Sequence, residues 1–203
     1  MKKVITSIII VLCIGAGIWI GSIILSYKKV SFQLLGEGYS VRVHSNTGKE
    51  LRTVDTSQDV RLQAGDYGYR TIGSEVRGDI VPFRVTSSGD TIVIKPRYTE
   101  GYLQNLAKSE QENILRTLVQ QYPSAHNIAI TRLALDEIAE LAYGTLIIGA
   151  DTANVYRFVM KRTDTSQPWK VAIVPSIIIS RETAKANGIP EDILNSLYKP
   201  SNQ

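Results

Sequence analysis

Few residues in this chain of 203 could perform acid–base or metal chemistry, and they are scattered. Its two histidines, His44 and His126, are far apart in sequence, and we expect each to be a surface or loop residue. The one cysteine, Cys13, lies in an apolar run, so no disulfide or thiolate metal site is expected. Zinc-protease, phosphate-loop and serine-nucleophile motifs are absent from the sequence. We therefore predict no catalytic residue, no cofactor, no metal site and no enzyme activity.

The closest group of carboxylates is Asp136 and Glu137 together with Glu140. Acids that are buried together can split their pKa values, which is how a pair of carboxylates becomes an acid and a base. These three follow a strand-like run, which favours a solvated connection instead. An acid of this group beside His126 in a cleft would indicate an enzyme.

Three tyrosines, Tyr39, Tyr67 and Tyr69, are close to predicted turns in the first part of the chain. Exposed tyrosines are rigid, amphipathic anchors that binding surfaces use. On a strand, however, Tyr67 and Tyr69 share one face, and we favour a position in the core.

The elements that must position these residues change character along the chain. Residues 30 to about 97 form short alternating segments separated by turn residues, which predicts a small antiparallel β-sandwich. Turns are expected at residues 36–38 and 45–49. Pro82 interrupts a strand pattern, which indicates an edge strand or a bulge.

Residues 60–70, with the sequence VRLQAGDYGYR, resemble the core of PEGA-type, prealbumin-like β-domains. In that family a strand ends at a leucine, passes a glycine turn and resumes with alternating tyrosines. The Pro-Glu-Gly-Ala signature itself is replaced here by Leu-Gly-Glu-Gly-Tyr at residues 35–39. The resemblance implies a fold, and a binding or spacer module without catalytic residues.

Beyond residue 98 the apolar residues recur every three or four positions as far as Tyr122, which predicts an amphipathic helix of roughly 20 residues. Four strand-like runs follow, at residues 128–135, 141–148, 154–161 and 169–179. Two short helices are expected between residues 181 and 198, the second with Pro190 at its first turn. The order indicates an α+β domain with a long helix packed on a curved antiparallel sheet.

This order, with Gln-Pro-Trp-Lys-Val-Ala at residues 167–172, resembles cystatin-like and NTF2-like domains. The resemblance implies a concave sheet that can form a pocket, lined by residues 141–148 and 155–159. The candidate lining residues are Tyr143, Tyr156, Arg157 and Trp169.

Residues 4–27 carry no charge and stand between two pairs of lysines, Lys2-Lys3 and Lys28-Lys29. A helix of this length covers about 36 Å, enough to cross a hydrocarbon core of about 30 Å. The run is longer than the apolar region of a cleaved signal peptide, and it ends in bulky residues where a signal peptide has small residues at its cleavage site. We therefore expect a retained anchor. Gly17 and Gly21 have the spacing that could pack two such helices into a homo-oligomer. The anchor residues along the run include Val4, Ile8, Leu12, Trp19, Ile24 and Tyr27.

The formal net charge of +4 belongs to the flanks of this run. Four of the 23 Lys and Arg residues flank it, and the other 19 equal the 19 Asp and Glu residues. No basic cluster is visible beyond the anchor, so nucleic acid is not an expected partner. The small positive excess at the N-terminus favours a cytoplasmic N-terminus, with residues 30–203 outside the cytoplasm.

The sequence therefore predicts a membrane-anchored chain with two small domains. Residues 1–29 form the anchor, residues 30–97 the all-β sandwich, and residues 98–203 the α+β domain. We expect non-catalytic binding or scaffold domains that contact other proteins of the cell envelope. The alternatives are a tethered small-ligand or enzymatic NTF2-like pocket, and a VirB8-like component of a secretion or conjugation apparatus.

Overall fold

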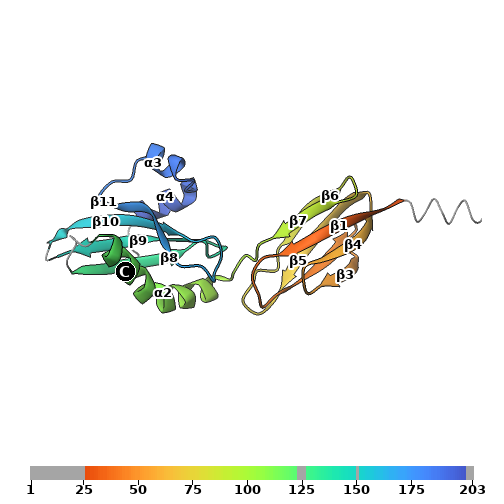
Figure 1. Cartoon of the computed structure of the whole chain (residues 1–203), viewed down its shortest axis with the longest axis horizontal. Coiled ribbons are helices and arrows are strands. Elements are labelled where there is room, and N and C mark those ends of the chain that lie inside the picture. Colours follow the sequence, from red (N-terminus) through yellow and green to blue (C-terminus); the bar gives the residue numbers. More distant parts are fainter. Residues whose placement is uncertain (1–25, 123–126, 150, 200–203) are drawn as a thin grey trace, which may run out of the picture. The chain divides into compact units, whose positions relative to one another are not determined.

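The computed structural model describes residues 26–122, 127–149 and 151–199, which fold into two compact units (Figure 1). The first unit contains the described residues up to Gly73 together with Gly78–Lys95. The second contains Ser74–Arg77 and the described residues from Pro96 onward. The described residues are mostly β-sheet with one long helix. Ser74–Arg77, expected in the first domain, thus belongs to the second unit, where Val76 pairs with Tyr98.

Most of the predicted anchor lies outside the described residues, including Val4, Ile24 and the pair Gly17 and Gly21. Tyr27, expected as the last anchor residue, begins strand β1 (Tyr27–Leu34) and is 43% exposed. No helix within the described ranges has the length and apolar character that a membrane crossing requires.

The first unit consists of two β-sheets that face each other. One sheet has the strand order β4-β1-β7 and the other β3-β2-β5-β6. The inner faces bury Val30 and Phe32 from β1, and the Phe32 ring meets Phe83 of the other sheet edge-on at 5.7 Å. The remaining strands are β2 (Ser40–Ser45), β3 (Glu50–Val54), β4 (Gln58–Gln63), β5 (Gly65–Ile72), β6 (Ile80–Val85) and β7 (Asp90–Ile94).

The expectation of a purely antiparallel sandwich is wrong at one pair, because β1 and β7 run parallel. Residues 45–49 form the expected hairpin turn, in which Gly48 has a φ of +82° that a glycine adopts without strain. The edge position predicted for Pro82 is confirmed, because β6 is the last strand of its sheet. A proline there removes no hydrogen bond from the interior of the sheet.

Three tyrosines of the first unit, Tyr39, Tyr67 and Tyr69, are buried or half-buried. Tyr39 is buried, and its hydroxyl donates to the carbonyls of Leu35 and Ile94. Tyr67 and Tyr69 are half-buried around Phe83, with Tyr67 stacked on that ring at 5.6 Å. The core position predicted for Tyr67 and Tyr69 therefore holds in part, and Tyr39 is a core residue as well.

Asp90 closes the turn between β6 and β7. Its carboxylate accepts hydrogen bonds from the backbone N–H of Thr86 (2.9 Å) and of Ser87 (3.1 Å), and from the Ser87 hydroxyl (2.7 Å). The Thr86 N–H, followed by the two Ser87 groups, holds the pKa of Asp90 at about 2, below its ordinary 3.8. All these bonds favour the charged form.

Because the folded pKa of Asp90 is lowered, its contribution to stability is present above the unfolded pKa. That contribution is lost as the pH falls from about 4 through about 2. We expect Asp90→Asn to lower the unfolding temperature of the first unit at pH 6, and the difference from the parent to shrink toward pH 2. Thermal melts of the full chain followed by tyrosine circular dichroism measure this. Asp55→Asn, at an exposed position of the same unit, is the control, and an equal pH dependence in both variants would contradict the assignment.

The second unit is built on an antiparallel sheet with the strand order β11-β10-β9-β8. Helix α2 (Glu100–Gln121) precedes it and is capped by the Thr99 side chain. The predicted bounds are confirmed for β8 (Ile128–Leu135) and β9 (Leu141–Ile148). β10 (Asp151–Lys161) starts earlier than expected and β11 (Lys170–Ser176) is shorter. The two expected short helices are α3 (Arg181–Ala186) and α4 (Glu191–Tyr198), with Pro190 at the N-cap of α4.

Helices cover both faces of this sheet (Figure 1). Helix α2 packs along β8 and buries Ile114 and Leu118. Helices α3 and α4 form a cluster with Val159 of β10 and Ile173 of β11 on the other face. Side chains alternate along a strand, so the buried neighbours of Val159 point toward the α2 face.

Candidate functional site

Two of the predicted pocket residues, Tyr143 and Arg157, lie on the sheet face that α3 and α4 cover. Tyr143 packs against the α3–α4 cluster. The Arg157 guanidinium donates to the carbonyls of Leu197 and Ile177 and lies over the Tyr198 ring, 4.3 Å from its centre. The C-terminal helices therefore cover the sheet face that carries these two predicted pocket residues.

The other two pocket residues are elsewhere in the unit. Tyr156 precedes Arg157 on β10, so its side chain points to the opposite face. Trp169 precedes β11, and its indole N–H donates to the Glu110 carboxylate of α2 at 3.3 Å. The four predicted side chains thus do not converge on one cavity in the described part of the chain.

The acidic group forms the turn between β8 and β9. The Asp136 carboxylate accepts from the backbone N–H groups of Glu140 and Leu141, each at 2.8 Å. Asp136 is half-buried and so less solvated than expected, and this burial raises the pKa of its carboxyl. Glu137 is exposed and pairs with Arg97 at 3.2 Å. His126 lies outside the described residues.

A densely bonded polar cluster centres on Arg162, which follows β10 and whose side chain is 1% exposed. Its Nε donates to the carbonyl of Ala139 at 2.8 Å, and its Nη1 donates to Glu110 at 3.1 Å and to the carbonyl of Thr165 at 3.2 Å. The guanidinium also lies over the Trp169 ring, 4.1 Å from its centre. This cluster fastens α2 to the loop that joins β10 and β11.

A groove of about 370 Å³ lies beside this cluster. The Arg162 Nη2 atom is buried and has no hydrogen-bond partner. Glu110 and Arg162 neutralise each other, so the pair gives the groove little net charge. Polar and apolar atoms contribute equally to its walls, and the lining residues are Glu110, Asn113, Arg116, Thr117, Arg162, Thr165, Ser166, Gln167, Pro168 and Trp169.

An exposed apolar surface lies at the β11 edge of the sheet. Ile178 is 73% exposed in the segment after β11, and Ser176 at the end of β11 pairs with Arg157 in the middle of β10. Large exposed apolar patches on soluble domains often mark interaction sites. We name this surface the apolar edge; its members are the exposed residues Val174, Ile177 and Ile178, which are close together along the chain.

No protein-family model, no curated protein and no solved structure matches this chain. Function is therefore argued from the geometry of the two units. Within the described ranges, no three His, Cys, Asp or Glu side chains gather as metal ligands.

Proposed function

We propose that this chain is a single-pass membrane protein that presents two non-catalytic units outside the cytoplasm for contact with other envelope proteins. The uncharged run at residues 4–27 and its flanking lysines support the anchor and its orientation. A component of a secretion or conjugation apparatus is one kind of protein within this class.

We extend the proposal to the fold of each unit. The first is a prealbumin-like sandwich of the PEGA type, which its two facing sheets support. The second is a cystatin-like or NTF2-like domain, which the long helix followed by four sheet neighbours in chain order supports. Helices α3 and α4 are then an addition that covers the face carrying Tyr143 and Arg157.

The apolar edge is the observation that carries the proposed contact function. The face that carries Tyr143 and Arg157 is covered by the chain's own helices, whereas the apolar edge leaves Ile177 and Ile178 exposed at 43% and 73%. Covering such side chains removes apolar area from water, which favours association. Pro175 within this segment limits strand addition, so side-chain packing is the expected mode of contact.

Site-specific photo-crosslinking in membranes tests this function. A crosslinking residue at Ile178 of the full chain is expected to give discrete adducts with a neighbouring protein. The same residue at Lys170, exposed on β11, or at Glu112, exposed on α2, is expected to give none. Equal adducts at all three positions, or none in a chain that remains in the membrane fraction, would contradict the proposal.

A tethered small-ligand binder is the second candidate, and one observation favours it. The groove beside Trp169 is large enough for a small polar molecule, and Arg162, which lines it, has a buried Nη2 atom without a hydrogen-bond partner. Native mass spectrometry of the purified full chain tests this candidate. A retained small molecule that is lost in Gln167→Trp, which would fill the groove, would favour it over the contact function.

A further inference from the structure

The chain passes from its uncharged run into folded structure without a spacer. Tyr27 is both the last residue of the run and the first residue of β1. β1 is the central strand of its sheet, held by β4 on one side and β7 on the other. Each extended residue spans at most about 3.6 Å, so the beginning of β1 cannot move far from the end of the run.

Strand register shows which connections lie at the same end of the unit as Tyr27. Tyr27 pairs with Gln63 at the β4–β5 connection, and Gly65 pairs with Val85 before the β6–β7 turn. Ser45, the last residue of β2, pairs with Tyr67 near the start of β5, so the β2–β3 hairpin lies at this end of the unit as well. We name this surface the β1 end; it contains Tyr27 and the connections at residues 45–50, 63–65 and 85–90.

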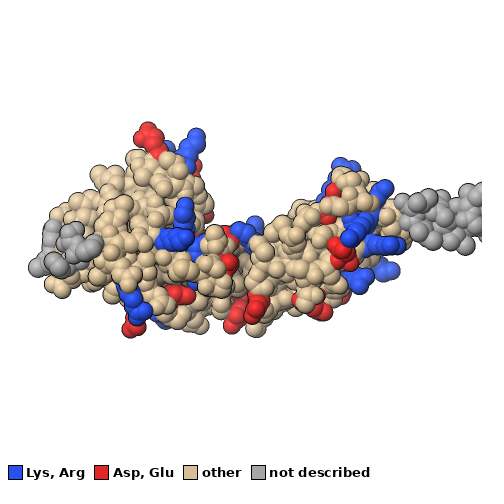
Figure 2. Space-filling view, viewed as in Figure 1, with Lys and Arg blue, Asp and Glu red and all other residues tan. Residues whose placement is uncertain are grey.

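Lys and Arg side chains gather at and beside the β1 end (Figure 2). Lys29 and Arg61 are direct partners in the β1–β4 ladder, and like charges opposite each other are unfavourable. Lys29 is offset by Asp59 at 2.8 Å. Among the described residues, no ion pair offsets Arg61, Lys28 or Lys49.

Two tyrosines accompany these cations. Tyr27 is 43% exposed, and the Tyr67 hydroxyl donates to the carbonyl of Gln63, the ladder partner of Tyr27. Amphipathic tyrosine rings beside basic residues are typical of a membrane–water interface. Basic side chains close to a membrane surface are attracted to anionic phospholipids.

We propose that the β1 end lies against the headgroup layer of the chain's own membrane, with Lys28, Lys49 and Arg61 contacting anionic phospholipid headgroups. This inference rests on the proposed membrane anchor. The first unit is then positioned on the bilayer by its own surface as well as by the anchor.

Fluorescence quenching in vesicles tests the proposal. Single cysteines replace Ser88 in the β6–β7 turn, Asn46 in the β2–β3 hairpin and Glu37 at the opposite end, in full chains carrying Cys13→Ser. A dye on each cysteine is exposed to lipids with nitroxide headgroups. Vesicles contain phosphatidylcholine alone or with phosphatidylglycerol. We expect several-fold stronger quenching at positions 88 and 46 than at 37, increased by phosphatidylglycerol and reduced by joint substitution of Lys28, Lys49 and Arg61 with Gln.

Three other outcomes would each contradict a different part of the proposal: the surface, the headgroup contact or the membrane anchor. Equal quenching at all three positions, in a chain that resists extraction by alkaline carbonate, would overturn the proposed surface while the anchor stands. If quenching is stronger at positions 88 and 46 but is changed neither by phosphatidylglycerol nor by the three substitutions, the contact with anionic headgroups would be overturned. A chain that alkaline carbonate removes from the vesicles would overturn the proposed function itself.

Discussion

Replacing Arg162 with alanine is expected to lower the free energy of unfolding of the second unit by about 3–5 kcal/mol. The guanidinium is buried and bonds to α2, to the β8–β9 turn and to the β10–β11 loop. Its loss leaves the Glu110 carboxylate, with a side chain only 19% exposed, without its cation. It also leaves the carbonyl of Ala139 without a donor.

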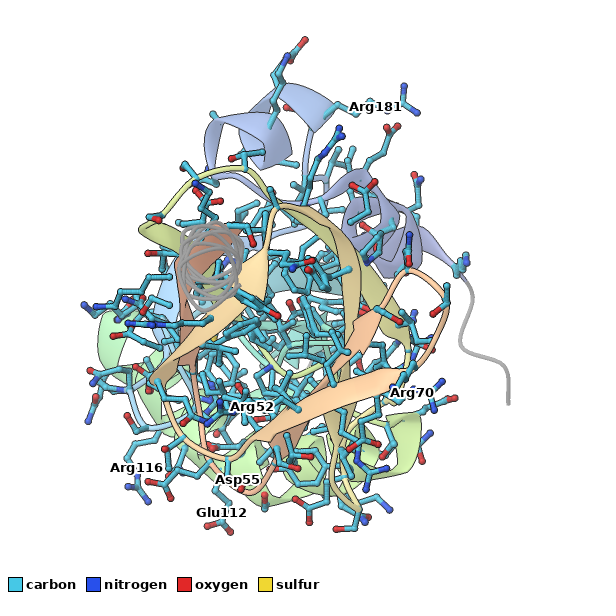
Figure 3. The ribbon with its side chains drawn as sticks, turned by 90° about the vertical axis from the view of Figure 1, so that its right-hand side faces the viewer. Arg52, Asp55, Arg70, Glu112, Arg116 and Arg181 are labelled. Atoms are coloured by element: carbon cyan, nitrogen blue, oxygen red, sulfur yellow. The ribbon has the colours of Figure 1, made fainter. Side chains whose placement is uncertain are left out.

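Urea unfolding of the full chain in detergent measures this effect. The chain has two tryptophans, so Trp19→Phe leaves Trp169 as the reporter, directly against the Arg162 guanidinium. Arg116→Ala is the matched control, because Arg116 lines the same groove but extends away from the unit (Figure 3). We expect this control to change stability by less than about 0.5 kcal/mol.

A second comparison separates the ion pair from general loss of packing. Arg162→Met combined with Glu110→Gln is expected to cost less than Arg162→Met alone, because the double variant leaves no uncompensated charge. If Arg162→Ala and Arg116→Ala had equal stability, the cluster would not hold the unit together.

Replacing Gly144 with alanine is expected to destabilise the second unit by about 3 kcal/mol, near the upper limit of overpacking effects. Gly144 lies in β9 between Leu133 of β8 and Phe158 of β10. A Cβ atom there would overlap the backbone carbonyl of Arg132. The ladder shifts register between Ile130 and Arg132, and backbone cannot yield as a flexible side chain can. The strands would have to separate.

Gly101→Ala is the control for Gly144→Ala. Gly101 lies in the first turn of α2, where an added Cβ meets open space. Alanine there is expected to stabilise the unit by about 0.5 kcal/mol, since it is the better helix former. Trp169 fluorescence in the same background reports both variants. A Gly144→Ala chain as stable as its parent would show that β8 can move aside without cost.

The sequence predicted where the strands and helices of the second unit begin and end better than it predicted which elements lie side by side. The bounds of β8 and β9 agree because alternating apolar residues end at turn-forming residues such as Asp136 and Gly149. Strand β3 was missed because only Val54 of its five residues is buried, which leaves no apolar alternation. The parallel pairing of β1 with β7 was missed because a strand pattern indicates faces and not neighbours.

The sites show the same limit. Arg162 was not a candidate, because its partners Glu110 and Trp169 become neighbours only in the folded unit. Glu110 is 52 residues from Arg162 and 59 from Trp169. The C-terminal helices were expected, yet the sequence signals that predicted them did not indicate which sheet face they cover. Because they cover the face that carries Tyr143 and Arg157, no predicted pocket is open at these two residues.

The parallel pairing of β1 with β7 has a mechanical consequence. Parallel strands place the start of β1 and the end of β7 at opposite ends of the ladder, which runs from Val30–Asp90 to Leu34–Ile94. A pull between residue 27 and residue 95 therefore acts on the two strands in opposite directions along their length. The hydrogen bonds of the ladder resist it together, in shear, and do not open one after another as in a pulled hairpin. A protein tethered at residue 27 and pulled from beyond residue 95 would transmit tension across its first unit through this ladder.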